Sequence, residues 1–275
     1  MPYTSTRQLA FALLFAIHSA AIADNHIFYN GAPLLTVTRT GSLEPLSLTE
    51  SNGLDKPRVM PALKRAIKSL FAPGETRTDR RVIGFKIDPG YGCTEPDQVI
   101  LSDKLPTDGV LSTKPLAAPK HPGVTRANPH QRQQAVTALD TVLRNEKSLS
   151  SQQRDQLIKS ASINVVKLDA SGLSNFIVEA ELQAQGAASV NMMIILTPDK
   201  SGKLNPTFTD VRIGGPSDSD GYAGRQSFVD HIDLDGDGVD ELLVSHTGYE
   251  SASIKVYQRQ GPAWVEVADG VGTGC

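Results

Sequence analysis

Short strand-like segments follow one another through the second half of the chain, and this pattern limits the fold more than any other feature. Turn sequences such as Pro198–Gly202 and Gln260–Pro262 separate several of them. The segments are Ile163–Leu168, Phe176–Leu182, Asn191–Thr197, Val229–Asp233, Leu242–His246, Ile254–Gln258 and Trp264–Val267. Their succession predicts an antiparallel β-sheet in the C-terminal part of an α+β protein.

Two amphipathic helices precede these strands. The first is expected from about His130 to Lys147, and the second begins at Ser150 or Ser151, whose hydroxyl can cap its first turn. Together they predict a helical hairpin packed beside the C-terminal sheet. The sheet and hairpin form one predicted domain, residues 131–275.

A smaller N-terminal region of mixed helix and strand, residues 24–103, is expected before this domain. Leu34–Thr38 and Val82–Ile87 are strand-like, and apolar residues recur at helical spacing from Met60 to Phe71, before Pro73-Gly74. Residues 104–130 contain five prolines, which predict a linker and a domain boundary.

The N-terminus has the three parts of a secretory signal peptide. Arg7 precedes the apolar run Leu9–Ile17, and Ala21-Ile22-Ala23 provides a cleavage site of small residues. The apolar run is too short to span ~30 Å of hydrocarbon. We therefore expect residues 1–23 to be removed after Ala23 and the mature protein to be periplasmic or secreted.

Two further features narrow the class of protein. The two cysteines, Cys93 and Cys275, both lie in the mature chain, and export to an oxidising compartment predicts that they form a disulfide. The chain has 27 basic and 30 acidic residues, a net charge of −3. This balance argues against a nucleic-acid partner, and no segment predicts an integral membrane protein.

One acidic segment carries specific chemistry. Asp233, Asp235 and Asp237 occupy positions 1, 3 and 5 of a loop that contains Gly238, and carboxylates at this spacing gather inside one tight turn. The Val239 carbonyl at position 7 and the Glu241 carboxylate at position 9 complete the expected ligand set. Asp240 is expected to point away from the ion, and the nearby His231 is expected on the sheet surface.

The ligand chemistry favours Ca²⁺. Hard oxygen donors suit Ca²⁺, whereas Mg²⁺ demands stricter geometry and Zn²⁺ prefers histidine or cysteine. An EF-hand is a poor match because position 12 is Val244 and the flanking segments resemble strands. The alternative is an Asp/Gly-rich turn that binds no metal.

A calcium loop between two strands that closes at position 9 resembles the FG-GAP repeat of integrin α-subunit propellers and of exported bacterial proteins. The resemblance covers about residues 228–267 and implies that Asp233, Asp235, Asp237, Val239 and Glu241 are the ligands. The Phe-Gly and Gly-Ala-Pro sequences of that family are absent.

A second, degenerate copy of the loop is one interpretation of Lys167–Asn175, and an unrelated turn is the other. Two copies cannot close a propeller. We therefore expect an open sheet that resembles a propeller blade, or a sandwich.

The function that these features favour is an exported, calcium-binding, non-enzymatic module with a protein- or glycan-binding surface. An envelope inhibitor or immunity-type protein would fit this description. Residues of types favoured at interfaces suggest the surface near the loop: Tyr222, Arg225, Tyr249, Glu250 and Trp264. The chain contains no nucleophile-elbow, H-E-x-x-H or P-loop motif. The alternative is a secreted hydrolase in which Ca²⁺ is structural and catalytic acids converge only in the fold.

Overall fold

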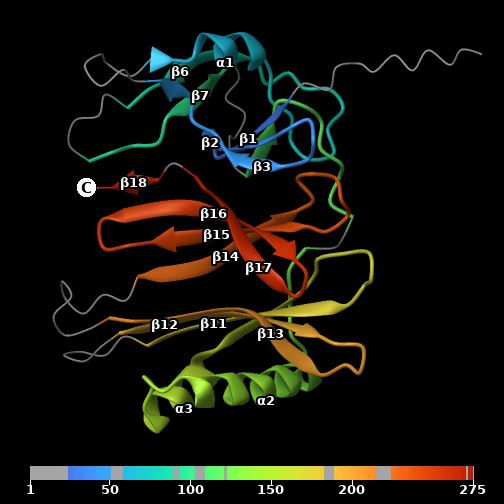
Figure 1. Cartoon of the computed structure of the whole chain (residues 1–275), viewed down its shortest axis with the longest axis vertical. Helices are drawn as coiled ribbons and strands as arrows, with labels where there is room; N and C mark the ends of the chain where they lie inside the picture. Colours follow the sequence, from blue (N-terminus) through green and yellow to red (C-terminus); the bar gives the residue numbers. More distant parts are fainter. Residues whose placement is uncertain are drawn as a thin grey trace, which may run out of the picture.

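A computed structural model of the chain describes residues 24–50, 58–88, 93–102, 109–120, 123–182, 189–214, 224–270 and 272–274. The predicted signal peptide, Tyr222 and Cys275 lie outside these residues. The described part confirms the α+β class and a C-terminal antiparallel sheet. Its layers follow the long axis in Figure 1: the N-terminal region, two antiparallel sheets and a pair of helices.

The N-terminal region is built on a sheet of order β3-β2-β1-β8, with two small hairpins and one short helix. Its elements are β1 (Asn25–Tyr29), β2 (Ala32–Val37), β3 (Leu43–Pro45), β4 (Thr49–Glu50), β5 (Arg58–Val59), α1 (Pro61–Ala66), β6 (Val82–Lys86), β7 (Gln98–Leu101) and β8 (Val110–Ser112). The expected strands at 34–38 and 82–87 correspond to β2 and β6.

The helix expected between Met60 and Phe71 is only partly present. Helix α1 ends at Ala66, and Ile67 already has an extended backbone (φ −86°, ψ 93°). The following residues pair with other strands, because Ser69 bridges Arg81 and Phe71 bridges Ser112. Ile67 and Leu70 fill the N-terminal core from this extended segment. Their spacing suited a helix, but burial against the neighbouring strands overrides that local preference.

The C-terminal part is a sandwich of two antiparallel sheets with the helical hairpin on its outer face. One sheet has the order β13-β12-β11-β10-β9, and the other has the order β14-β15-β16-β17, with β18 beside β16. Their elements are β9 (Thr125–Arg126), α2 (Pro129–Asn145), α3 (Ser151–Ser160), β10 (Ser162–Lys167), β11 (Ser174–Leu182), β12 (Val190–Pro198), β13 (Leu204–Ile213), β14 (Arg225–Ile232), β15 (Glu241–Thr247), β16 (Ser251–Gln260), β17 (Ala263–Asp269) and β18 (Thr273–Gly274).

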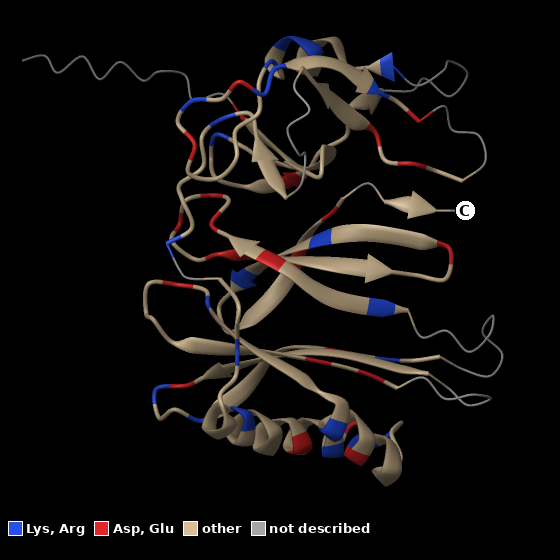
Figure 2. Ribbon diagram, turned by 180° about the vertical axis from the view of Figure 1, so that it is seen from behind, with Lys and Arg blue, Asp and Glu red and all other residues tan. Residues whose placement is uncertain are grey.

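The hairpin α2–α3 covers the free face of the first sheet. Capping boxes at Asn128 and Ser150 begin the two helices, so Ser150 is the cap of the second one. Leu139, Leu143 and Leu157 are buried against the sheet. Both helices contain charged residues of either sign (Figure 2). None of the described helices is long and apolar enough to cross a membrane.

Each boundary between layers has its own apolar cluster. Strand β12 is buried along almost its whole length because both of its faces are covered. Met192 and Ile194 pack toward the helices, whereas Met193 and Ile195 pack toward the second sheet. A further cluster joins the second sheet to the N-terminal region, with Leu243 and Val256 against Leu35. The sheet of β14–β17 is therefore the central layer of the molecule.

Backbone pairing also joins the C-terminal strand to the N-terminal region. Thr94 forms an isolated antiparallel bridge with Gly274, in which the Gly274 N–H donates to the Thr94 carbonyl over 3.1 Å. Cys93 and Cys275 are the adjacent residues in the sequence. Since Cys275 lies outside the described residues, their disulfide stays a prediction, and the bridge places their neighbours side by side.

Candidate metal centre

The acidic turn joins two paired strands at one end of the central sheet. Ile232 is the last residue of β14 and pairs with Glu241, the first residue of β15. Between them, Gly236 and Gly238 have φ angles of 84° and 88°, a region that residues with a Cβ rarely adopt. These two glycines let the backbone wind tightly enough to turn successive aspartates toward the same interior.

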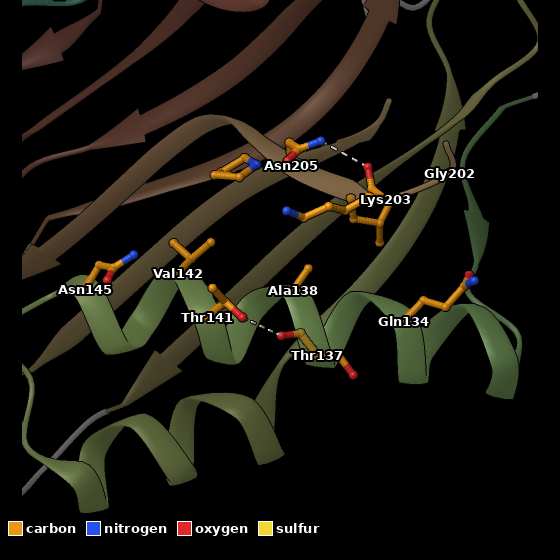
Figure 3. Close-up of a pocket in the computed structure, with 11 residues that line it drawn as sticks. Gln134, Thr137, Ala138, Thr141, Val142, Asn145, Gly202, Lys203 and Asn205 are labelled. Carbon is orange, nitrogen blue, oxygen red and sulfur yellow. Dashed lines mark hydrogen bonds between the residues drawn. The ribbon is translucent and has the colours of Figure 1, made fainter. Parts of the chain in front are cut away.

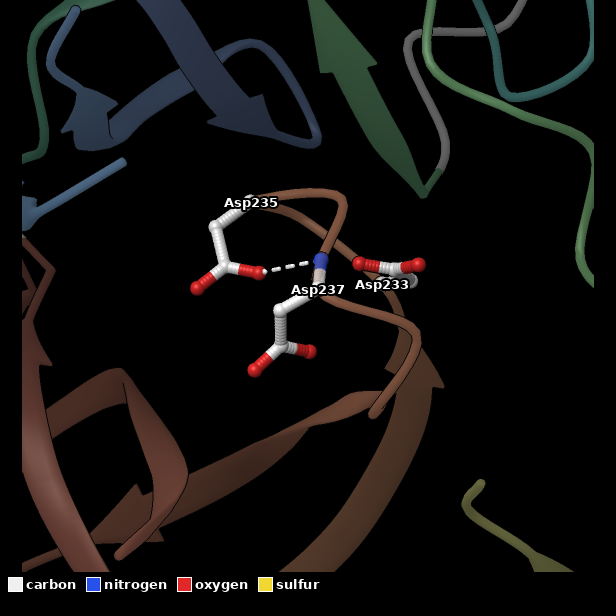
Figure 4. Close-up of side chains that lie close together, drawn as sticks. All are labelled: Asp233, Asp235 and Asp237. Carbon is white, nitrogen blue, oxygen red and sulfur yellow. Dashed lines mark hydrogen bonds between the residues drawn. The ribbon is translucent and has the colours of Figure 1, made fainter. Parts of the chain in front are cut away.

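Three carboxylates gather in this turn. Each of Asp233, Asp235 and Asp237 offers an oxygen that lies within 4.8 Å of the others (Figure 4). Backbone N–H groups hold them in place: Asp233 accepts from Gly236 over 2.7 Å, and Asp237 accepts from Val239 over the same distance. The Asp237 N–H in turn donates to Asp235 over 3.0 Å. The arrangement is close enough to hold a metal ion.

A fourth carboxylate lies beneath the turn. Glu241 is 1% exposed, and its Oε2 accepts a hydrogen bond from the Leu234 N–H over 2.8 Å. The pKa of Glu241 is raised to about 8, mainly because the carboxylate is buried. The hydrogen bond from the Leu234 N–H lowers this pKa, whereas the negative charges of Asp235, Asp237 and Asp233 raise it further. Val239, the remaining predicted ligand, lies in the turn and forms an isolated bridge with Asp169.

The charge of the turn also affects Asp235 itself. Burial raises the pKa of Asp235, the hydrogen bond from the Asp237 N–H lowers it, and the charges of Asp237 and Asp233 raise it again. The Gln258 amide on β16 donates to Asp235 Oδ2 over 2.8 Å. Gln258 was missed in the sequence, where a single polar residue in a strand gives no signal of its partner.

One basic group pairs with the turn from the N-terminal side. Lys120 Nζ lies 3.9 Å from Asp233 Oδ2, and its side chain is largely exposed. An exposed ion pair at this distance is screened by water and contributes little free energy. Lys120 therefore leaves most of the negative charge of the turn uncompensated.

His231 is not on the sheet surface, and that expectation is wrong. Its side chain is buried, and its Nδ1 lies 2.7 Å from Oδ2 of the equally buried Asp240. A bulge between Phe228 and Asp230 shifts the register of β14, which reverses the alternation of inward and outward residues after it. Asp240 therefore points to His231, away from the three-aspartate cluster.

We expect Asp240→Ala to lower the free energy of unfolding by about 1–3 kcal/mol, because it leaves a buried imidazole nitrogen without its partner. Urea denaturation with a chelator present measures this cost without any contribution from a bound cation. Asp240→Asn keeps a carbonyl oxygen at the same position and should be less costly. Equal stability of Asp240→Ala and the unmodified chain would contradict a structural role for the pair.

The suspected second copy of the loop lies beside the acidic turn. The Asp240 N–H donates to the Leu168 carbonyl over 2.7 Å, and Asp169 bridges Val239. Asp169, which aligns with Asp235, forms an ion pair with Arg259 at 2.9 Å. The Arg259 guanidinium thus neutralises the Asp169 carboxylate. The matching carboxylate of the acidic turn, Asp235, accepts hydrogen bonds from two neutral groups, the Asp237 N–H and the Gln258 amide.

The residues suggested as a recognition surface do not gather near the acidic turn. Trp264 is buried in the cluster between the two sheets, because alternation along β17 turns it inward and its neighbour Val265 outward. Arg225, Tyr249 and Glu250 are exposed, but Arg225 pairs with Thr247 at the other end of the β14–β15 hairpin. At ~3.3 Å per residue, seven residues of strand place this end roughly 20 Å from the turn.

No protein-family model matches the chain, and the comparisons with curated proteins and with solved structures also found no match. The resemblance of residues 228–267 to an FG-GAP loop therefore stays a prediction. The geometry of the turn and the chemistry of its donors carry the functional interpretation.

Proposed function

We propose that this chain is an exported, non-enzymatic module in which Ca²⁺ binds the turn from Asp233 to Glu241. One observation carries the proposal: three carboxylates converge in one turn above a buried fourth. Carboxylates at such distances repel one another, and a divalent cation removes that repulsion.

The donor set favours Ca²⁺ over other divalent ions. All the side-chain donors are oxygens, and Ca²⁺ accepts six to eight of them in flexible geometry. The nearby imidazole of His231 would be the natural Zn²⁺ ligand, but its Nδ1 already contacts Asp240. The Val239 carbonyl and water would complete the coordination.

The proposed role of the ion is to stiffen the central layer. The turn connects β14 to β15, and Gln258 and Asp169 connect it to β16 and to the first sheet. A cation that fixes the turn would therefore hold both sheets of the sandwich in register. The stiffened sandwich would then present a surface to a protein or glycan, as expected of an envelope inhibitor or immunity-type protein.

Isothermal titration of the mature protein with Ca²⁺, Mg²⁺ and Zn²⁺ tests the proposal. We expect one Ca²⁺ per chain, with weaker binding of Mg²⁺ and Zn²⁺. Asp237→Asn should reduce the Ca²⁺ affinity at least tenfold, because it removes an exposed ligand with little effect on the core. Asp199→Asn is the matched control, since Asp199 organises its turn through similar backbone hydrogen bonds but has no acidic neighbours.

Two results would argue against the proposal. One is the absence of binding heat for all three ions, and the other is an equal loss of affinity in Asp199→Asn and Asp237→Asn. Affinity capture from the native envelope, once with Ca²⁺ and once with chelator, then tests whether a partner is bound in a calcium-dependent manner.

A further inference from the structure

A polar cavity of about 370 Å³ lies between the two sheets, at the start of β14. Its walls come from β11 and β12 on one side and from residues 225–227 on the other, where the start of β14 lies over the first sheet (Figure 1). This end of β14 is opposite the acidic turn. The cavity is therefore separate from the proposed calcium site.

Asn191 is the buried polar side chain of this cavity. It is 5% exposed, and its amide has no hydrogen-bond partner within the described residues. On β12 it lies two residues from Met193, which packs between the sheets, so alternation directs Asn191 toward the same side. Gln226, another residue of the lining, carries a buried acceptor, Oε1, that has no hydrogen-bond partner within the described residues. A buried acceptor without a partner loses the free energy of its hydrogen bond to water, and a donor of a ligand in the cavity would restore that bond.

Glu179 supplies a carboxylate on the same face. Its Oε1 accepts a hydrogen bond from the Phe228 N–H over 2.9 Å, and its Oε2 has no hydrogen bond within the described residues. Burial raises the pKa of Glu179, while the hydrogen bond from Phe228 and the charge of Arg225 lower it. Burial therefore penalises the charged carboxylate, and a cation placed against it would offset that penalty.

The guanidinium of Arg225, the basic group in the cavity lining, already has partners. Arg225 Nη1 lies 3.5 Å from Glu181 Oε2, and Arg225 Nε donates to the Ser227 hydroxyl over 2.8 Å. Glu181 is directly opposite Asn191 in the β11–β12 register. Two glutamates and one arginine leave the cavity with an excess of negative charge and of hydrogen-bond acceptors.

In a second cavity, the amide of the lining residue Asn205 already has hydrogen-bond partners. The hollow of about 460 Å³ between α2 and the start of β13 is lined by Thr137, Thr141, Lys203 and Asn205, among others (Figure 3). The Asn205 Nδ2 group donates hydrogen bonds to the Lys203 carbonyl over 3.0 Å and to Asp199 over 3.2 Å. By contrast, the amide of Asn191 makes no hydrogen bond with the residues that the structure describes.

We propose that the cavity at the start of β14 binds an ammonium group, with Glu179 Oε2 and Asn191 Oδ1 accepting its hydrogen bonds. An ammonium carries three donors and a positive charge, which match these acceptors and the excess negative charge. The ammonium belongs to a lysine side chain of a partner or to a free polyamine. The inference does not depend on calcium.

Titrations of the calcium-loaded mature protein, followed by NMR chemical-shift changes, test the inference. The probes are a blocked trilysine peptide, the same peptide with all three lysines Nε-acetylated, and spermidine. We expect saturable shifts at residues around the cavity with at least one ammonium probe and none with the acetylated peptide. Binding of the peptide alone assigns a lysine side chain, binding of spermidine alone assigns a polyamine, and binding of both assigns the ammonium group itself.

Four variants separate the cavity from the general surface charge. Glu179→Gln and Asn191→Ala should each weaken binding at least tenfold, and Glu179→Gln retains an acceptor for the Phe228 N–H. Asp155→Asn removes one negative charge from an exposed position on α3, and Asn205→Ala alters the second cavity. Both controls should bind as the unmodified chain does.

Three outcomes would overturn the inference: no saturable shift with either ammonium probe, equal binding of the acetylated peptide, or an unchanged affinity in Glu179→Gln. Thermal unfolding of each variant verifies that it is folded. If Asn191→Ala proves unfolded, Glu179→Gln and the acetylated peptide still decide the question.

Discussion

Calcium is expected to raise the unfolding temperature of the mature protein by roughly 5–10 °C when its concentration is a hundred times its dissociation constant. At that ratio mass action adds about 2.7 kcal/mol to the free energy of unfolding. For chains of this size each kcal/mol corresponds to about 2–4 °C. The gain arises because the ion binds the folded turn and not the unfolded chain. Differential scanning fluorimetry with calcium and with chelator measures it.

The same shift should depend on pH in a defined direction. In the cation-free fold the pKa of Glu241 is raised from its ordinary 4.5 to about 8. The folded chain therefore binds the Glu241 proton more tightly than the unfolded chain does. The resulting gain in the free energy of unfolding is complete below about pH 4.5 and is lost as the pH rises through about 8. The chelated protein should lose stability between pH 5 and pH 8, and calcium should raise the unfolding temperature more at pH 8. A calcium effect that is larger at pH 5 would contradict this electrostatic explanation.

Asp237→Asn should abolish most of the calcium-dependent rise and also stabilise the chelated protein slightly, because it removes one charge from a crowded turn. This opposite effect in the two conditions distinguishes a metal ligand from a structural residue. Asp155→Asn, on the exposed face of α3, should change neither value. If Asp237→Asn lowers stability equally with and without calcium, the carboxylate acts only as a turn residue.

Reduction of the predicted disulfide between Cys93 and Cys275 should lower the free energy of unfolding by about 2–5 kcal/mol. The bond would close a loop of most of the mature chain, so its loss greatly increases the entropy of the unfolded state. In the fold, the bridge between Thr94 and Gly274 already joins the adjacent residues. Peptide mapping without reductant should find the two cysteines in one linked fragment.

The matched control for this prediction is the double variant Cys93→Ser, Cys275→Ser. Reductant should destabilise the unmodified chain and leave the double variant unchanged. Two free thiols in the denatured, unreduced protein would contradict the pairing. Because the test needs no calcium, its outcome is independent of the metal site.

The elements with strong periodicity could be predicted from the sequence. Strands β10, β11 and β12 and the hairpin α2–α3 occur close to their expected positions, since their apolar residues face a neighbouring layer. Strand β13 was missed because Pro206 and several polar residues interrupt its pattern. Pro206 is tolerated there because β13 is an edge strand, with a bulge at that point of its pairing with β12.

The remaining differences come from contacts between distant residues. The bulge in β14 buries His231, the pairing of Phe71 with Ser112 shortens α1, and no local pattern reports either event. The acidic turn could be predicted because its ligands lie within nine residues. Gln258 could not be predicted, since only the pairing of β16 with β15 brings it to the turn. The cavity residues Glu179 and Asn191 could not be predicted either, because the cavity forms only where the start of β14 packs on the first sheet.

A crystal structure grown in excess calcium is the most direct test of the metal site. It should contain a strong density peak inside the turn, about 2.3–2.6 Å from oxygens of Asp233, Asp235, Asp237 and Glu241 and from the Val239 carbonyl. Anomalous scattering would identify the ion as calcium. A turn without such a peak, with its aspartates directed into solvent, would contradict the account.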